Sequence, residues 1–305
     1  MQLTVIVPSF NQGRFIGRTL DSILDQDVPV SEVIVVDGGS TDETVEVLRD
    51  YAERHPQLHW LSEPDDGPAD AVNKGLAMAR GDIAAIQSSD DIYYPGAFAA
   101  VGQVFDDEPD CGFVIGNYRG INAEDEPLYT SDLPAFSWEA YFGMALCIPQ
   151  SSIFFRMDVA REAGGWNPKY YGCDLDFWLR ILLRTEARRI PDVLSGWRIY
   201  GDQRTFSGQQ AKIWEGYWQM IEDCAELSTA SPRVRRLAKA SRDILAMQFH
   251  PTGNRWAVRG HALRALIRHP TFWRYQQPEH LRRLVPGYGR ARMLYRRLAT
   301  RRVSA

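Results

Sequence analysis

EVIVVDGGSTDET, residues 32–44, sets the pattern that the first hundred residues repeat. An apolar run ends at an aspartate, small turn-forming residues follow, and a helix-like stretch comes next. LTVIVP (3–8), Leu58–Leu61 and Asp82–Gln87 are similar apolar runs, separated by segments with helical periodicity. Repeated β-α units of this length predict an α/β fold, with a Rossmann-like, mostly parallel sheet flanked by helices.

Acidic residues stand where two of these strands should end. Asp37 closes one apolar run, and Asp90 and Asp91 follow another in IAAIQSSDD. Open α/β sheets bind ligands at the carboxyl ends of their strands, and carboxylates are good ligands for hard divalent cations. These positions therefore predict a site for a polar ligand that carries phosphates and a divalent cation.

The strand pattern loosens after about residue 112 and stops after Phe206. Helical periodicity then covers 210–227, 234–249 and 256–269, with a further helix expected within 281–300. We predict a core domain with two halves and a helical, basic C-terminal extension. The predicted boundaries are 1–110 and 111–207 for the two halves and 208–305 for the extension.

The charge of the chain is distributed unevenly. Residues 1–232 hold 17 Lys and Arg against 37 Asp and Glu, whereas residues 233–305 hold 18 against two. The basic region predicts an acidic partner, either an anionic membrane surface or the acidic face of the protein itself. Its leucines and the lack of a nucleic-acid-binding motif argue against nucleic acid as the partner.

Targeting signals and cysteine patterns are not recognisable. Met1 leads almost directly into the first strand, and no apolar run approaches the roughly 18 residues that span a bilayer. Four scattered cysteines lack metal-binding spacing. We expect reduced thiols and a cytoplasmic protein, peripheral on the inner face of the membrane. The cysteines are Cys111, Cys147, Cys173 and Cys224.

Several motifs, in this order and spacing, resemble the family 2 inverting glycosyltransferases of the GT-A fold. They are VIVPSFNQGRFI (5–16), VVDGGSTDET (35–44), SEPDDGPADAVNKGLAMARGD (62–82), SSDD (88–91) and DLDFWLR (174–180). The resemblance covers roughly residues 3–207. It implies transfer of a hexosyl or N-acetylhexosaminyl group from a nucleotide sugar, with UDP favoured, to an acceptor hydroxyl. It also implies Mn²⁺ or Mg²⁺ at the diphosphate leaving group.

The resemblance also implies roles for residues of the donor-binding half. Asp91 matches the metal-binding carboxylate and Asp90 the residue facing the donor ribose or sugar. Asp37 matches the aspartate that accepts a hydrogen bond from the nucleobase. The remaining donor-binding candidates are Pro8, Ser9, Asp65, Asp70 and Asn73. A turn, a helix cap or a solvated helix face is the structural alternative for each acidic residue.

The catalytic base of an inverting transfer takes the proton of the acceptor hydroxyl. Asp174 matches the family's catalytic aspartate, although Cys173 stands where a glutamate usually precedes it. Asp176 is the alternative candidate. Arg204, in the loop 201–207, is expected at the diphosphate.

A further departure concerns the metal site. Many relatives carry a histidine ligand after a Trp-Arg or Tyr-Arg strand, but GWRIYGDQRT has Tyr200 there. Neutral tyrosine is a poor ligand for Mg²⁺ or Mn²⁺, so either the cation relies on Asp91, phosphates and water, or Asp202 substitutes. The QxxRW signature of processive synthases is absent, which argues against a membrane-embedded polymerase.

The expected partners are a nucleotide-sugar donor and a glycan or lipid-linked saccharide acceptor in bacterial cell-surface polysaccharide synthesis. Two alternatives remain open. One is a catalytically degenerate protein that only binds nucleotide sugars, and the other is a sugar nucleotidyltransferase. The second would require a Gly-rich basic loop after the first strand, where the chain offers only Gly13 and Arg14.

Overall fold

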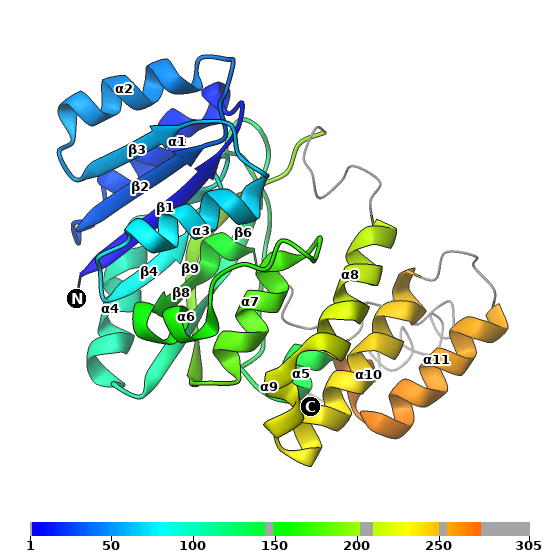
Figure 1. Cartoon of the computed structure of the whole chain (residues 1–305). Coiled ribbons are helices and arrows are strands. Elements are labelled where there is room, and N and C mark those ends of the chain that lie inside the picture. The colour runs from blue at the N-terminus through cyan, green and yellow to red at the C-terminus, as the bar shows by residue number, and fades with distance from the viewer. Residues whose placement is uncertain (1, 144–148, 202–209, 250–254, 276–305) are drawn as a thin grey trace, which may run out of the picture. The chain divides into compact units, whose positions relative to one another are not determined.

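The computed structural model describes residues 2–143, 149–201, 210–249 and 255–275. The chain divides into two compact units (Figure 1). The first contains residues 1–136 and 147–209, and the second contains residues 137–146 and 210–305. The second unit thus includes a short segment, 137–146, that lies inside the N-terminal domain predicted from the sequence.

The first unit is built on a nine-stranded sheet with the order β3-β2-β1-β4-β8-β6-β9-β5, and β7 pairs with β6. Its first four strands are parallel, with helices in the connections between them. The α/β fold class predicted from the repeated apolar runs is therefore confirmed. These elements are β1 (Leu3–Ser9), α1 (Gly13–Leu24), β2 (Glu32–Asp37), α2 (Thr44–Arg54), β3 (Leu58–Ser62), α3 (Pro68–Met78) and β4 (Ile83–Ile86).

The second half of the sheet is mixed. Strand β8 pairs antiparallel with both β4 and β6, whereas β6 and β9 run parallel. Residues 186–198 form a single long strand, β9. The elements are β5 (Ile92–Tyr93), α4 (Ala97–Asp107), β6 (Cys111–Ile121), β7 (Pro127–Thr130), η1 (Gln150–Ser152), β8 (Ile153–Arg156), α6 (Met157–Ala163), α7 (Cys173–Leu182) and β9 (Glu186–Arg198).

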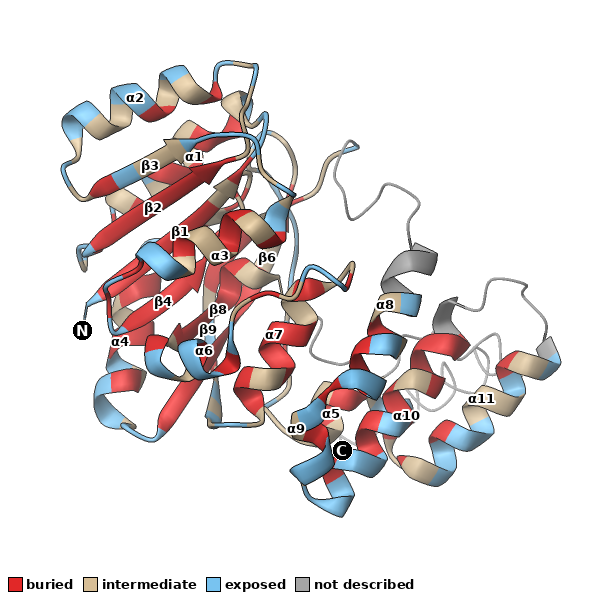
Figure 2. Ribbon diagram, viewed as in Figure 1, coloured by how far each residue is buried: buried red, intermediate tan, exposed pale blue. Residues whose placement is uncertain are grey.

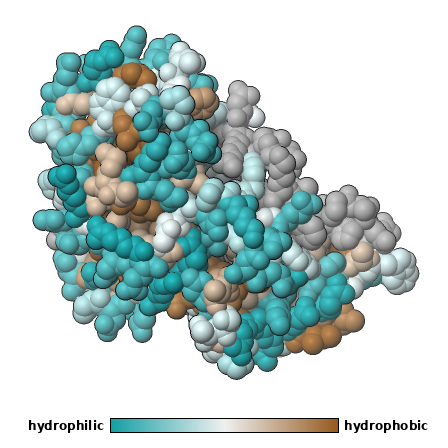
Figure 3. Space-filling view, viewed as in Figure 1, coloured by the Kyte–Doolittle hydropathy of each residue, from teal (hydrophilic) through white to brown (hydrophobic). Residues whose placement is uncertain are grey.

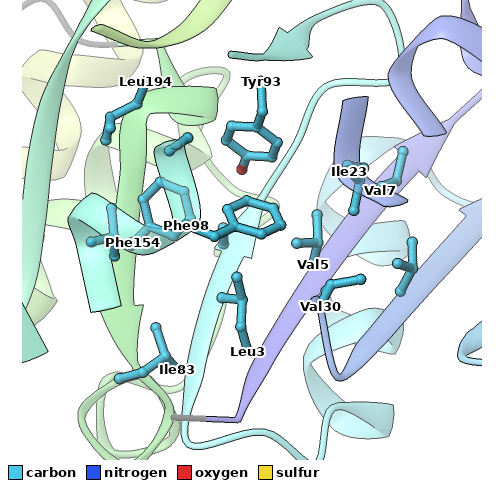
Figure 4. Packing of buried hydrophobic residues seen from close by; sticks show 14 of the residues in the cluster. Leu3, Val5, Val7, Ile23, Val30, Ile83, Tyr93, Phe98, Phe154 and Leu194 are labelled. Atoms are coloured by element: carbon cyan, nitrogen blue, oxygen red, sulfur yellow. The ribbon is translucent and has the colours of Figure 1, made fainter. Parts of the chain in front are cut away.

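The core of this unit lies along the central strands, which are buried on both faces (Figure 2). Aromatic side chains pack where the parallel half of the sheet meets the mixed half (Figure 4). Phe98 packs against Tyr93 and Phe154, with ring centroids 5.0 and 6.0 Å apart. Full burial of each such side chain contributes about 1.5–3 kcal/mol. This packing holds the end of β4, and so the segment that follows it, against the rest of the sheet.

The second unit is helical. Its core joins Ile244 and Met247 to Val258, Ala265 and Phe272. The helix predicted over 210–227 is divided at Cys224, and the helix predicted within 281–300 lies outside the described residues. The elements are α5 (Trp138–Phe142), α8 (Gln210–Asp223), α9 (Ala225–Thr229), α10 (Pro232–Phe249), α11 (Arg255–Arg268) and η3 (Phe272–Tyr275). Among the described helices, none has the length and apolar character needed to cross a membrane.

Candidate active site

The loops that follow β1 and β2 are tied together at the carboxyl edge of the sheet. Asn11 adopts a left-handed backbone conformation (φ 52°), and its N–H donates to Ser40 Oγ at 2.6 Å. The Thr41 N–H donates back to Asn11 Oδ1 at 2.9 Å. In the register of the two strands, Ser9 stands beside Asp37. The sequence therefore builds a fixed rim where the strand-end motifs meet.

Asp37 is enclosed within this rim. Its side chain is fully buried, and Oδ2 accepts hydrogen bonds from the N–H groups of Gly39 and Ser40 and from Ser62 Oγ. Oδ1 accepts from Ser40 Oγ. All of these donors belong to the ends of β2 and β3, so the carboxylate holds the loop in shape. Oδ2 accepts three of these hydrogen bonds and Oδ1 only one, so Oδ1 is the oxygen with capacity left to accept from a nucleobase.

A different carboxylate lies over the same loop. Gly38 has no side chain, and a Cβ built there would come within 2.9 Å of Asp65 Oδ2. Asp65 is half-buried, and its Oδ1 accepts from the Gly67 N–H at 2.8 Å. The Asp65 carboxylate thus occupies the space that a side chain at position 38 would take.

Asp90 and Asp91 lie in different environments. Asp91 is 1% exposed, and its Oδ1 accepts from the Arg198 N–H at 2.8 Å. Burial, together with the negative charge of Asp90, raises the pKa of Asp91 well above its ordinary value. Asp90 is half-buried, and its Oδ2 accepts from the Tyr200 hydroxyl at 2.9 Å. Of the two carboxylates, Asp90 is the more exposed.

The carboxylates of Asp90 and Asp91 supply only part of the ligand shell of a divalent cation. Two adjacent carboxylates supply the hard oxygen ligands that Mg²⁺ and Mn²⁺ prefer. Within the described residues, however, no group of three or more His, Cys, Asp or Glu side chains gathers as a cation site. Oxygens from a diphosphate and from water would have to complete the coordination shell.

Arg198, which the sequence analysis did not single out, organises this acidic pair. Its side chain is fully buried, and its Nε donates to the Asp90 carbonyl at 2.6 Å. Nη1 donates to the carbonyl oxygens of Asn122 and Ala123, and the guanidinium pairs with Asp125. The available signal was an arginine inside the otherwise uncharged strand end LSGWRIY, a position where burial requires partners for its charge.

Tyr200 occupies the position where relatives place a histidine. Its ring packs against Phe15, with centroids 4.9 Å apart, and its hydroxyl faces Asp90. Burial and the negative charge of Asp90 raise the pKa of the Tyr200 hydroxyl, so the side chain is a neutral hydrogen-bond donor at physiological pH. Asp202, the other candidate for the missing ligand, lies outside the described residues.

The two aspartates of α7 also differ. Asp176 is buried and forms an ion pair with Arg180, at 2.6 Å. Arg180 donates in addition to the carbonyl oxygens of Ala163 and Gly165. Asp174 is half-buried in the first turn of the helix. Asp176 is thus committed to holding the loop before α7, and Asp174, the more exposed of the two, stays the predicted base.

Two predicted donor-binding residues make contacts within the protein. Asn73 donates through Nδ2 to the Trp166 carbonyl at 2.9 Å, and its Oδ1 accepts from the Trp166 N–H at 2.8 Å. Asp70 pairs with Lys74 at 3.1 Å, and the hydrogen bond from Lys74 lowers the pKa of Asp70. Asn73 therefore anchors the loop before α7 to α3, and Asp70 belongs to a surface ion-pair cluster that also includes Glu63.

Other predicted residues lie at the same edge of the sheet. Pro8 is half-buried at the end of β1, and the neighbouring Ser9 hydroxyl is buried with no hydrogen-bond partner among the described residues. The amide of Gln87, just beyond β4, is likewise buried without one. Buried polar groups rarely stay unsatisfied, so these atoms point to a bound ligand or water. Arg204 lies outside the described residues.

Known proteins resemble this chain in sequence and in fold. An uncharacterized glycosyltransferase of Nostoc sp., alr2836, is 27% identical over 178 residues, which cover 55% of each protein, so the chain spans about half the length of this relative. Staphylococcus aureus TarS 1–349, solved with UDP-GlcNAc, matches with a TM-score of 0.65 at 14% identity over 89% of this chain and 90% of that one. The mannosyltransferase PcManGT of Pyrobaculum calidifontis, solved with GDP-Man and Mn²⁺, matches with a TM-score of 0.64 at 22% identity over 98% and 82%.

At these identities the structural matches establish the fold alone. The profile of Glycosyl transferase family 2 matches residues 4–161, which is more than half of the chain and includes the loops after β1, β2 and β4. The chain therefore belongs to glycosyl transferase family 2.

Proposed function

We propose that the protein is a metal-dependent inverting glycosyltransferase that moves a sugar from a nucleotide-sugar donor to an acceptor hydroxyl. The observation that carries this proposal is the pairing of a reachable Asp90 with an enclosed Asp91 that Arg198 fixes in place. The solved neighbours support it, because they were crystallised with UDP-GlcNAc and with GDP-Man and Mn²⁺.

The donor binds at the carboxyl edge of the parallel strands in this proposal. Asp65, which lies over Gly38, accepts a hydrogen bond from the nucleobase beside Asp37, the carboxylate that the resemblance implies. The unpartnered Ser9 hydroxyl contributes to the same pocket. A UDP-sugar remains the favoured donor, and Arg204 is expected at the diphosphate.

We assign the cation to Asp90 rather than to Asp91, the carboxylate that the resemblance implies, because Asp90 is the more exposed of the two. Asp90 would hold the cation, and the buried Asp91 would fix the position of the segment. A bound Mn²⁺ or Mg²⁺ would neutralise the charge that develops on the diphosphate leaving group. Asp174 takes the proton of the acceptor hydroxyl as that oxygen attacks the anomeric carbon from the side opposite the leaving group. Attack from that side inverts the configuration of the sugar.

The acceptor in this proposal is a glycan or a lipid-linked saccharide of cell-surface polysaccharide synthesis. Support comes from the basic region 233–305, whose charge suits an anionic membrane surface. The protein would then work as a peripheral membrane enzyme.

The test is thermal stabilisation of the purified protein by UDP, GDP, dTDP and CMP, each with and without Mn²⁺. A shift for one nucleotide that grows with Mn²⁺ supports the proposal and identifies the base. Asp90→Asn should keep the nucleotide shift but lose its Mn²⁺ dependence, and Asp65→Asn should reduce the nucleotide shift itself. No shift with any nucleotide would contradict the proposal.

The second candidate is a protein that binds a nucleotide sugar without transferring it. Tyr200 favours this alternative, since a hydrogen-bond donor stands where relatives place a metal ligand. Stabilisation by a nucleotide sugar, without transfer of the sugar to any acceptor or to water and without release of nucleoside diphosphate, would support this candidate over the enzyme.

A further inference from the structure

Helix α11 carries apolar side chains on two opposite faces. Val258 and Ala265 are buried against the core of the second unit. On the opposite side, Trp256, Leu263 and Ile267 follow a helical repeat and are 77%, 60% and 70% exposed. Figure 3 shows hydrophobic atoms gathered along this edge. A helix needs only one apolar face to join a protein core, so the outer face requires a separate explanation.

The exposed apolar side chains are concentrated in this segment. Leu266 and Trp273 add to the outer face, at 45% and 48% exposure. The Arg259 guanidinium lies 5.2 Å from the centre of the Trp256 ring, and Arg274 lies 5.5 Å from that of Trp273. Exposed apolar side chains gathered in one segment in this way indicate an interaction site. Tryptophan beside arginine is typical of surfaces that sit at the boundary between lipid and water.

The charge around the patch is positive, and only part of it is paired within the described residues, by Glu139, Glu222 and Asp243. Residues 232–275 contain ten Lys and Arg, and their one acidic residue, Asp243, is buried and bonded to His261, Arg264 and Arg268. A hollow of about 310 Å³ opens between α10 and α11. It is lined by Pro232, Arg235, Arg236, Lys239 and Arg268.

The positive charge around the patch also indicates which partner can bind there. Residues 276–305 contain eight arginines and one glutamate, so this part of the chain is electrostatically mismatched to the patch. The patch of a second copy would be equally basic. An anionic bilayer complements both features, because its headgroups attract arginine and its acyl boundary accepts tryptophan, leucine and isoleucine.

We propose that the outer face of α11, together with η3, docks the protein on an anionic phospholipid bilayer, with Trp256, Leu263 and Ile267 entering the headgroup region. The inference deepens the proposed function, since it rests on a lipid-linked acceptor as the reason for membrane docking. It gives the basic extension a defined contact surface.

The experiment is co-sedimentation of the full chain with vesicles of phosphatidylcholine, with and without phosphatidylglycerol. We expect binding to the anionic vesicles that weakens with salt, and little binding to pure phosphatidylcholine. Leu263→Gln/Ile267→Gln should weaken binding by about tenfold or more, because two apolar anchors are lost. Leu128→Gln is the matched control, since Leu128 is 54% exposed on β7 of the other unit, and it should bind as the wild type does.

A second variant tests the electrostatic part. Arg236 and Lys239 form no ion pair with any described residue, so Arg236→Gln/Lys239→Gln should leave folding intact and weaken binding to anionic vesicles. Wild-type binding by the Leu263→Gln/Ile267→Gln variant, or failure of the wild type to bind anionic vesicles, would overturn the proposal. A dimer that this variant converts to a monomer, without vesicle binding, would also overturn it and assign the face to self-association.

The same preparations separate this proposal from the function above. A Mn²⁺-dependent nucleotide shift without vesicle binding overturns the docking and leaves the transferase standing. Vesicle binding without any nucleotide shift supports the docking and contradicts the transferase.

Discussion

The hydroxyl of Tyr200 donates a hydrogen bond of 2.9 Å to Asp90 Oδ2. The carboxylate that we assign to the cation is therefore already bonded to a neutral side chain. The ring is held in place by Phe15. The interaction fixes the position of the Asp90 carboxylate before any ligand arrives. It also means that a cation at Asp90 must share that carboxylate with the hydroxyl.

Tyr200→His should lower the Mn²⁺ concentration at which the cation enhances nucleotide binding. An imidazole nitrogen is a metal ligand, whereas the hydroxyl is not, and we expect about a tenfold lower Mn²⁺ requirement, the scale of ligand-shell changes in proteins. The measurement is a Mn²⁺ titration of UDP-induced thermal stabilisation. Tyr200→Phe, which only removes the hydroxyl, is the control, and an equal effect of both variants would refute a ligand role for position 200.

Substitution of Asp90 should affect the Mn²⁺ response, whereas substitution of Asp91 should lower the free energy of unfolding. Asp90→Asn is expected to abolish the Mn²⁺ effect and leave the free energy of unfolding nearly unchanged. Asp91→Ala should cost about 1–3 kcal/mol, because the buried N–H of Arg198 loses its acceptor. Urea denaturation alongside the nucleotide shift checks both. Loss of the Mn²⁺ effect in Asp91→Ala alone, with stability intact, would return the metal ligand to Asp91.

Arg198→Gln should destabilise the first unit by about 3–5 kcal/mol, since it removes a buried charge that three backbone carbonyls and Asp125 share. Arg14→Gln is the matched control. Its ion pair with Glu124 is exposed and 3.5 Å long, so the loss should not exceed about 1 kcal/mol. Equal losses in the two variants would show that the buried network does not hold the site together.

Asp125 should give the protein part of its sensitivity to acid. Burial opposes ionisation of this carboxyl, but hydrogen bonds from Arg18 and Arg198 outweigh burial and lower its pKa from the ordinary 3.8. Its contribution to stability is therefore complete above that value and is lost as the pH falls through the lowered pKa. Asp125→Asn should flatten the acid side of a plot of Tm against pH. Asparagine also tolerates the left-handed backbone at this position (φ 70°).

The control for the acid effect is Asp132→Asn, because the Asp132 side chain is fully exposed. It should retain the acid dependence of the wild type. Identical Tm profiles for the wild type and Asp125→Asn would contradict the prediction.

Asp174→Asn should abolish sugar transfer and retain nucleotide binding, because the amide cannot accept the acceptor proton. Asp176→Asn should instead lower stability, since it breaks the buried pair with Arg180. Transfer assays and thermal shifts of both variants make the comparison. Wild-type turnover by Asp174→Asn would exclude it as the base.

The strands and most helices follow from local patterns, and the sequence predicts them within a few residues. The apolar runs at 3–8 and 82–87 become β1 and β4 because burial on both faces requires continuous apolar sequence. The orientation of individual carboxylates does not follow in this way. Asp37 ends a strand as predicted, but the donors that enclose it come partly from Ser62, which the local sequence cannot reveal.

The position of the Asp65 carboxylate depends on the lack of a side chain at Gly38. Its carboxylate fills space that Gly38 leaves open, and the two residues lie on different strand-end loops. Arg198 was missed for a related reason, since its partners at Asp90 and Asn122 lie 108 and 76 residues away in the chain. Predicting either contact requires the sheet to be assembled first.

The hydrogen bond between Arg198 and Asp91 spans 107 residues of sequence, and this separation has a consequence during synthesis. Contacts of such long range form late, because the intervening chain must first be ordered. A growing chain that has completed β1 to β4 already has the rim for a nucleotide, but it lacks the arginine that fixes the acidic pair. Sugar transfer would therefore begin only after β9 has joined the sheet, so incomplete chains would not consume activated sugar.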